Sequence, residues 1–277
     1  MTNPKTKVMM KLSQAIDILK KAGIDDPKGE SRRLFAEIGG IEYSRLVIGD
    51  PEIESEKLAE AIRKRSERFP LQYIIGKTDF YREEYELTED VLIPRPDTEI
   101  LVDYAVRNLP EGSRFIDLCT GSGCVAISTL KNTNSTTAVA VDISEGALRV
   151  AQRNAAKNGV LDRISIKKLD VLSSIEDGKF FAVLSNPPYV TKSAYENLEP
   201  ELYREPRLAL VGENDGLIFY ERIIPDYKDK IEDNGFIAFE IGFDQGDALS
   251  RLAALNSMKC EIIKDLSGND RVAVLKK

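Results

Sequence analysis

The sequence predicts an α/β protein in which helices cover both faces of a mostly parallel sheet, with a small helical bundle before the sheet and an antiparallel hairpin at its end. Three observations indicate this fold. Helical periodicity extends to about Phe69, strand-like and helix-like segments alternate from Ser113 onward, and a glycine-rich turn separates the first such strand from its helix. The 277 residues, of which 42% are hydrophobic, provide for one large or two modest domains.

We expect residues 1–69 to be helical throughout. Apolar side chains recur at helical spacing from Val8 onward, and Gly23 suits the end of the first helix. Asp26-Pro27 is typical of the start of a second helix, and residues 54–69 have the apolar face of a third. This bundle either stabilises the rest of the chain or docks a partner, and the sequence leaves both roles open.

Residues 70–92 form a predicted linker between two domains. Pro70 ends the third helix, and apolar and polar residues then alternate from Thr78 to Leu92, as they do in a β-hairpin. The second domain covers residues 93–277. It begins with Ile-Pro-Arg-Pro, whose prolines set the start of a helix over residues 100–109.

The second domain alternates strands and helices in an order that favours parallel pairing. Its last two strands are joined only by Ser267-Gly268-Asn269-Asp270, and so short a turn requires an antiparallel hairpin. The predicted strands cover residues 113–118, 136–142, 163–168, 180–185, 235–241, 258–265 and 270–275, and the predicted helices cover residues 123–131, 144–158, 215–231 and 244–255.

The glycine-rich turn Thr120-Gly121-Ser122-Gly123 follows the first strand of this domain. Glycine lets a backbone approach a ligand closely, and the next helix directs free N–H groups and the positive end of its dipole at the turn. A dinucleotide fingerprint would need a third glycine where Ala126 stands. The turn therefore favours a nucleoside without a pyrophosphate, such as S-adenosylmethionine, with a purely structural turn as the alternative.

Two carboxylates end the next two strands. Asp142 lies about twenty residues after the turn, where an acidic side chain can accept both hydroxyls of a ribose. Asp170 is followed by Val171, so the pair can accept from an adenine amino group and pack on its ring. The alternatives are a helix cap for Asp142 and a solvated turn for Asp170. Glu240, which ends a later strand, is either buried near the site or an ordinary strand-end charge, and the second interpretation is favoured.

The tetrapeptide Asn186-Pro187-Pro188-Tyr189 is the most specific motif. Consecutive prolines cannot continue a strand, so they fix the direction of their carbonyl groups. The Asn186 side-chain oxygen and the Pro187 carbonyl can both accept from one NH₂ group, and Tyr189 offers a flat face to an amide or a base. Two such acceptors suit the nitrogen of a weakly nucleophilic amide or aryl amine that must attack a methyl group.

The composition narrows the remaining possibilities. The net charge of −7 argues against binding bare nucleic acid, which needs a basic face. Three cysteines and no histidine disfavour a disulfide framework and a zinc site, so no metal is expected. Because no apolar run approaches the length of a membrane span or a signal peptide, we expect a cytoplasmic protein, and we take it to be a monomer.

Six segments together resemble the peptide chain release factor N5-glutamine methyltransferase family (HemK/PrmC type), which is a branch of the class I S-adenosylmethionine-dependent methyltransferases. The resemblance covers nearly the whole chain. One departure matters: Cys119 stands where the family's loop more often has glycine. Val171 is also a variable position, since a larger residue that stacks on the ring would bind adenine better. The segments are residues 70–76, 93–99, 117–123, 186–189, 205–206 and 268–271.

The resemblance implies a Rossmann-like seven-stranded methyltransferase sheet and a specific reaction. A methyl group would pass from S-adenosylmethionine to the side-chain N5 of the glutamine in the Gly-Gly-Gln motif of class I release factors, leaving S-adenosylhomocysteine. The helical bundle would help to hold the release factor. The implied cofactor-binding residues are Asp117, Cys119, Thr120, Gly121, Ser122, Gly123, Asp142, Asp170, Val171 and Asn186. The implied substrate-binding residues are Leu92, Arg95, Asn186, Pro187, Pro188 and Tyr189, of which Asn186, Pro187 and Tyr189 are the implied catalytic residues.

Three other functions compete with this one. The target could be a glutamine of a ribosomal protein, although the Arg95–Glu99 segment favours release factors. The target could also be an exocyclic amine of a nucleic acid, which the acidic composition disfavours. The third possibility is a binding module without catalysis, and the intact Asp117, Gly121, Gly123 and Asn186 argue against it.

Overall fold

The computed structural model describes residues 8–277 and divides them into two compact units. The first unit extends to Gly76 and includes the separate segment Glu199–Arg204, and the second comprises Lys77–Leu198 and Glu205–Lys277. Residues 1–7, the beginning of the predicted helical region, lie outside the described part of the chain. Each unit has buried hydrophobic side chains of its own.

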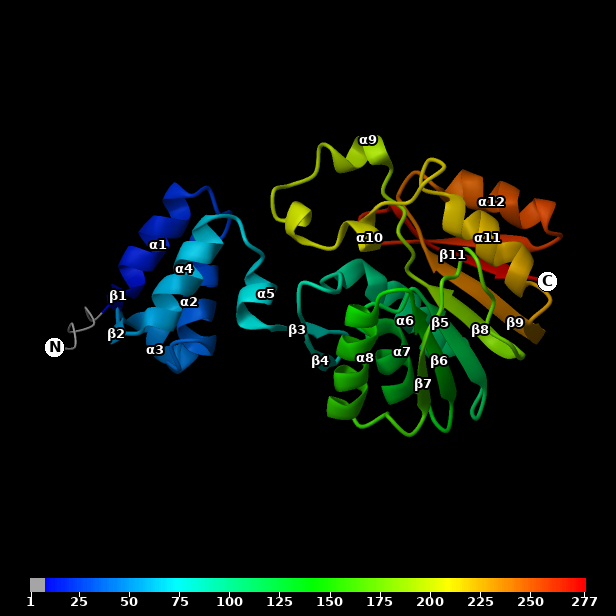
Figure 1. The fold of residues 1–277 in the computed structure, drawn as a ribbon, viewed down its shortest axis with the longest axis horizontal. Coiled ribbons are helices and arrows are strands. Elements are labelled where there is room, and N and C mark those ends of the chain that lie inside the picture. The colour runs from blue at the N-terminus through cyan, green and yellow to red at the C-terminus, as the bar shows by residue number, and fades with distance from the viewer. Residues whose placement is uncertain (1–7) are drawn as a thin grey trace. The chain divides into compact units, whose positions relative to one another are not determined.

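The first unit is mainly helical (Figure 1). The prediction of helix throughout was wrong at two short strands, which pair antiparallel with Met10 opposite Ile53. Each strand has only three residues, too few to show a period of two in the sequence. The elements are β1 (Met9–Lys11), α1 (Leu12–Lys21), α2 (Pro27–Glu37), α3 (Tyr43–Ile48), β2 (Glu52–Glu54), α4 (Glu56–Ser66) and α5 (Leu71–Ile75).

Two of these helices begin at capping side chains. The Asp26 carboxylate accepts from the backbone N–H of Gly29 at 2.8 Å, and the Ser55 hydroxyl accepts from that of Leu58 at 3.1 Å. Such caps satisfy N–H groups that have no partner inside the helix. The apolar faces of the helices then meet in a core that includes Leu12, Ala15, Leu19, Leu34, Phe35, Leu46, Leu58 and Ile62.

One buried charge fixes the separate segment Glu199–Arg204 to these helices. Arg65 of α4 is only 6% exposed and pairs with Glu30 and, at 3.0 Å, with Glu201. Arg68 contacts the same Glu201 carboxylate at 2.9 Å. Because a buried charge without a partner is strongly destabilising, Arg65 holds both carboxylates against the helical unit.

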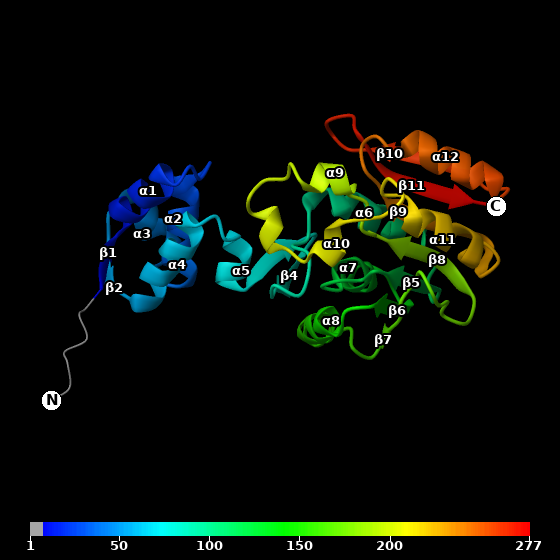
Figure 2. The ribbon, with the colours of Figure 1, turned by 45° about the horizontal axis from the view of Figure 1, so that its top comes forward.

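The second unit is built on a seven-stranded sheet, as predicted (Figures 1 and 2). The strand order is β10-β11-β9-β8-β5-β6-β7; the five strands from β9 to β7 are parallel, and β11 pairs antiparallel with both β9 and β10. The α/β fold and the terminal hairpin are therefore confirmed. The strands are β5 (Arg114–Leu118), β6 (Thr137–Asp142), β7 (Ile164–Lys168), β8 (Phe180–Ser185), β9 (Ile231–Glu240), β10 (Lys259–Lys264) and β11 (Asp270–Lys276).

Helices cover both faces of this sheet because its strands alternate apolar side chains between the faces. Phe115 of β5 packs on the side of α6 (Glu99–Asn108), α7 (Cys124–Lys131) and α8 (Glu145–Lys157). The next residue, Ile116, packs on the side of α11 (Ile218–Tyr227) and α12 (Gly246–Leu255). No helix within residues 8–277 is both long and apolar enough to cross a membrane.

Several short elements complete the second unit. The predicted hairpin consists of β3 (Lys77–Phe80) and β4 (Glu83–Glu86), and it ends six residues before the predicted limit at Leu92. The sequence did not predict the short helices α9 (Lys192–Tyr195) and α10 (Arg207–Leu210) or the 3₁₀ turn Pro96–Thr98. All three lie in the loops that follow strands or precede helices.

The sheet brings its carboxyl ends to one edge. Leu118, the last residue of β5, is level with Val141 of β6 on one side and Ser185 of β8 on the other. The chain therefore continues to one side of β5 through β6 and to the other side through β8. Open α/β sheets bind ligands at such a point of reversal.

Candidate active site

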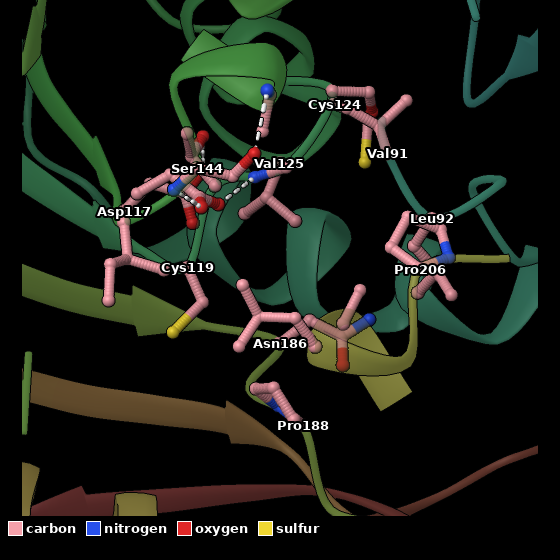
Figure 3. A pocket seen from close by; sticks show the side chains of 18 of the residues that line it. Val91, Leu92, Asp117, Cys119, Cys124, Val125, Ser144, Asn186, Pro188 and Pro206 are labelled. Carbon is pink, nitrogen blue, oxygen red and sulfur yellow. Dashed lines mark hydrogen bonds between the residues drawn. The ribbon is translucent and has the colours of Figure 1, made fainter. Parts of the chain in front are cut away.

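A cavity of about 160 Å³, open to the surface, lies in the second unit at this carboxyl edge. Figure 3 shows Asp117 and Cys119 on one side, Leu92 and Pro206 on the other, and Asn186 beside Pro188 below them. Its lining combines buried carboxylates and a side-chain amide with apolar side chains, as small-molecule sites do.

Most of the predicted site residues line this cavity, although they come from five separate parts of the sequence. Gly123, Pro187 and Tyr189 are the predicted residues that do not line it. The predicted residues that do are Leu92, Arg95, Asp117, Cys119, Thr120, Gly121, Ser122, Asp142, Asp170, Val171, Asn186 and Pro188.

The glycine-rich turn is held tightly to the sheet. The backbone N–H of Thr120 donates to the Val141 carbonyl at 2.9 Å, and that of Gly123 donates to the Thr120 carbonyl at 2.8 Å. Gly123 has φ = +83°, and a Cβ there would lie 2.8 Å from Cδ1 of Ile127. A glycine at position 123 is therefore required for close packing against the following helix. At Gly121, with φ = +55°, a Cβ would meet no atom within 4 Å.

Cys119 also adopts a left-handed conformation, with φ = +60°. At this position, where the family's loop more often has glycine, the backbone has the geometry that glycine accepts without strain. Burial raises the pKa of the Cys119 thiol well above its usual value, with the Asp142 carboxylate adding to the effect. The thiol is therefore held protonated at neutral pH.

Asp117 is a buried carboxylate beneath the turn. It is 1% exposed and accepts a hydrogen bond of 2.5 Å from the Thr120 hydroxyl. Burial raises the pKa of Asp117 to about 7, although the hydrogen bonds from Thr120 and the Ala126 backbone oppose the rise. The cavity thus has a carboxylate whose charge is poorly compensated in the absence of a ligand.

Asp142 joins the turn to the next helix. One of its oxygens accepts from the Gly121 backbone N–H and the other from that of Ser144, each at 2.9 Å. Burial raises the pKa of Asp142, and these backbone bonds partly offset the effect. The helix cap itself is Ser144, which accepts from Ala147 at 3.2 Å. Asp142 therefore orients the loop and lines the cavity but is not the helix cap, and its contact with a ribose stays a prediction.

Asp170 organises the turn after β7. Its side chain accepts from the Leu172 backbone at 3.0 Å and from the Ser173 hydroxyl at 2.9 Å. The neighbouring Val171 is 4% exposed and lines the cavity. The structural role of Asp170 is clear from these bonds, and its contact with an adenine stays a prediction.

The motif at residues 186–189 leads into a buried network. Asn186 donates from Nδ2 to the Thr98 hydroxyl at 3.2 Å, which directs its Oδ1 away from Thr98. Thr98 donates to Glu240 at 2.5 Å, and the Tyr189 hydroxyl donates to the other Glu240 oxygen at 3.0 Å. Interpreting Glu240 as an ordinary strand-end charge was therefore wrong, since it is 2% exposed and accepts two hydrogen bonds.

Glu205, to which the sequence assigned no role, holds the opposite wall of the cavity in place. Glu205 is 5% exposed, accepts from the Ile93 backbone at 3.0 Å and pairs with Arg95 at 2.5 Å. It thereby joins the loop after β4 to Pro206 and Leu208, which line the cavity. Thr98, Glu205 and Glu240 were missed because only the tertiary structure shows that these polar residues are buried together with partners.

The comparisons with known proteins agree with this geometry. Residues 11–76 match the model of the PrmC N-terminal domain, and residues 96–218 match that of the methyltransferase small domain. A methyltransferase from Pyrococcus furiosus has the same fold, with a TM-score of 0.52, 15% identity, and coverage of 69% of this chain and 86% of that one. The second unit is thus a methyltransferase domain.

Curated relatives extend the match over almost the whole chain. A release factor glutamine methyltransferase from Caulobacter vibrioides is 35% identical over 269 residues, covering 94% of this chain and 93% of the relative. One from Thermodesulfovibrio yellowstonii is 35% identical over 257 residues, covering 90% and 92%. The chain belongs to the release factor glutamine methyltransferase family.

The left-handed backbone at Cys119 predicts an inverted order of stability. Alanine keeps the strain that a Cβ causes at φ = +60°, and glycine removes it. Cys119→Gly should therefore have a free energy of unfolding about 1 kcal/mol higher than Cys119→Ala, whereas glycine is normally the less stable of the two. Denaturant unfolding of both variants measures this difference, and an alanine variant of equal or greater stability would contradict it.

Burial of Asp117 predicts a pH-dependent effect of Asp117→Asn. The folded protein holds this proton up to pH about 7, and the unfolded chain releases it near 3.8, so burial of the charged form costs stability increasingly as the pH rises between these values. Relative to wild type, Asp117→Asn should gain roughly 1–3 kcal/mol of unfolding free energy between pH 5 and pH 8. The exposed Asp233→Asn controls for loss of one charge, and a difference that stays flat with pH would refute this account of the site.

Proposed function

We propose that this protein transfers a methyl group from S-adenosylmethionine to the side-chain N5 of the glutamine in the Gly-Gly-Gln motif of class I release factors. The observation that best supports the proposal is the position of Asn186. Its amide lies at the cavity, across from the glycine-rich turn, and its Nδ2 is already bound by Thr98. The Oδ1 atom is therefore available to a substrate amide. The names of the relatives support glutamine as the target.

The residues on the turn side of the cavity fit S-adenosylmethionine. That molecule has a cationic amino group and a sulfonium, and Asp117 and Asp142 are buried carboxylates whose pKa values burial raises. A bound cation would compensate their charge. In this proposal residues 119–123 surround the methionine part, Asp142 accepts from the ribose, and Asp170 and Val171 hold the adenine. When bound, S-adenosylmethionine supplies the electrophilic methyl group.

The residues on the other side position the glutamine. Asn186 Oδ1 and the Pro187 carbonyl accept from the two N–H bonds of its side-chain amide, while Leu92, Arg95 and Pro188 enclose its methylene groups. Holding the nitrogen close to the methyl group supplies most of the acceleration, since positioning can contribute roughly 7–11 kcal/mol. The new C–N bond forms as the C–S bond breaks, and the nitrogen then loses one proton to solvent, because both of its acceptors are neutral.

The release factor itself is the proposed protein partner, and the helical unit is its proposed docking module. Helix α3 of that unit exposes three large side chains: Tyr43 is 51% exposed, Val47 51% and Ile48 90%. Exposed apolar groups gathered on one short helix are typical of a protein contact. Action on release factors would also place the enzyme in the cytoplasm.

Incubation of a purified class I release factor with the enzyme and S-adenosylmethionine tests the proposed reaction. Mass spectrometry should detect the addition of one methyl group, located on the glutamine of Gly-Gly-Gln. Asn186→Ala should lower kcat by roughly 100-fold or more, the loss typical when one preorganised polar group is removed, while leaving S-adenosylmethionine affinity near the wild-type value. The exposed Asn108→Ala should behave as wild type. Methylation of a ribosomal-protein glutamine or a nucleic-acid amine instead would contradict the proposal.

The docking role predicts a substrate-dependent effect of α3. The double substitution Val47→Ser/Ile48→Ser should raise KM for the intact release factor about tenfold, as loss of a hydrophobic contact at an interface does, and should leave turnover of a short Gly-Gly-Gln peptide unchanged. Leu255→Ser, on the second unit at 81% exposure, is a matched control. Equal KM values for all three proteins would exclude α3 from the contact.

A further inference from the structure

A chain of hydrogen bonds leads from the proposed substrate-binding amide to a buried carboxylate. Asn186 donates to Thr98 at 3.2 Å, and Thr98 donates to Glu240 at 2.5 Å. Tyr189, three residues after Asn186, donates to the second oxygen of Glu240 at 3.0 Å. Thr98 precedes α6 and Glu240 ends β9, so the chain joins three elements that are distant in the sequence. Both residues are buried, with 1% and 2% exposure.

The direction of this chain depends on the carboxylate. An ionised carboxylate can only accept hydrogen bonds, so the single Thr98 proton must point toward Glu240. The Thr98 oxygen can then only accept from Asn186, which places the Asn186 NH₂ group at Thr98 and the amide oxygen on the opposite side. Without this constraint, the side-chain amide of an asparagine fits its site almost equally well when it is rotated by 180°, which exchanges its oxygen and its nitrogen.

A reversed Asn186 would be unsuited to the proposed reaction. Its NH₂ group would then face the NH₂ group of the substrate glutamine, so a donor would meet a donor. One of the two acceptors that hold the nitrogen would be lost. The orientation of one amide therefore decides whether the site binds its substrate in a reactive position.

We propose that Glu240 and Thr98 are positioning residues, which fix the orientation of Asn186 and anchor Tyr189 through one buried hydrogen-bond chain. Neither residue needs to touch the methyl group or the attacking nitrogen. This inference rests on the proposed function, because it assigns the chain a task in binding the glutamine amide. The positioning role explains why Glu240 and Thr98 are polar, although apolar side chains at buried positions would cost less desolvation free energy.

Groups around Glu240 shift the pKa of its carboxyl group in both directions. Burial raises the pKa of Glu240, whereas the hydrogen bonds from Thr98 and Tyr189 and the nearby Arg271 lower it, and Asp97 raises it again. Arg271 is itself paired with Asp97 at 3.3 Å and with Asp265 at 3.1 Å. The Tyr220 hydroxyl donates to the backbone carbonyl of Glu240 at 3.0 Å.

Protonation of Glu240 turns one of its oxygens into a donor. The chain can then reverse at Thr98, or lose the bond from Tyr189. The kcat value should therefore fall as the pH falls through the pKa of Glu240, and be restored above it. Glu240→Gln has the shape of the protonated side chain and a permanent donor, so it should have a low kcat that does not rise over the same pH range.

A matched pair of substitutions at Thr98 tests the inference. Thr98→Val keeps the volume and removes the hydroxyl, and Thr98→Ser keeps the hydroxyl and loses only a methyl group. Thr98→Val should lower kcat on the release factor by about 10–100-fold, as a small misplacement of a reacting group does, while Thr98→Ser stays within about threefold of wild type. Isothermal titration should give wild-type S-adenosylmethionine affinity for both, because the cofactor residues are unchanged.

The outcomes separate this inference from the proposed function. If wild type is active and Thr98→Val is equally active, the positioning role is wrong and the proposed function stands. If wild type transfers no methyl group to a glutamine, both are wrong. Should Thr98→Val fail to fold, the pH profile of Glu240→Gln decides: a profile that follows that of wild type overturns the inference, and a low, flat profile supports it.

Discussion

The parallel pairing of β5 with β6 on one side and β8 on the other is the constraint on which the site depends. It places the ends of three strands at the same level, so that Asp117, Asp142 and Asn186 meet although they span some seventy residues of the chain. A shift of one residue in either pairing would turn these side chains toward the opposite face of the sheet. Phe115 and Ile116 of β5 are packed in the cores on opposite faces of the sheet, so such a shift would disrupt the packing on both faces.

Buried carboxylates are the second common feature of this edge. Asp117 and Asp142 lie on the proposed cofactor side, and Glu240 lies behind the proposed glutamine side. Each loses hydration and recovers only part of that free energy from nearby donors. The negative charges of Asp117 and Asp142 are only partly compensated by protein groups, and a cationic ligand can compensate them further. Glu240 instead accepts from two protein hydroxyls, which makes it suited to holding neighbours in place rather than to binding a ligand.

The sequence predicted the sheet well because its signals are local. Apolar runs end at Leu118, Asp142 and Ser185, and the short turn at residues 267–270 allows only a hairpin. Most of the residues that it predicted for the site line the cavity, since the glycine turn and the proline motif both follow directly on strands of the sheet. The strands β1 and β2 escaped prediction because they are too short to show a period, and they are stabilised by pairing with each other and by packing of Met10 and Ile53 on the helical core.

The polar residues that support the site could not be predicted in the same way. A strand-end glutamate and a threonine before a helix are ordinary in sequence, and only their shared burial distinguishes Glu240 and Thr98. The sequence marks Glu205 only in part, because this residue precedes a proline within one of the family segments. Its hydrogen-bond partners Ile93 and Arg95 are more than a hundred residues away in the sequence. Tertiary contacts between distant residues decide such roles, and periodicity does not report them.

A crystal structure of the enzyme with S-adenosylhomocysteine and a Gly-Gly-Gln peptide would test the central claim most directly. The account predicts that the glutamine side-chain nitrogen lies about 3 Å from both Asn186 Oδ1 and the Pro187 carbonyl, with Nδ2 of Asn186 still bound to Thr98. A glutamine bound elsewhere, or an Asn186 side chain that presents its nitrogen to the peptide, would contradict it.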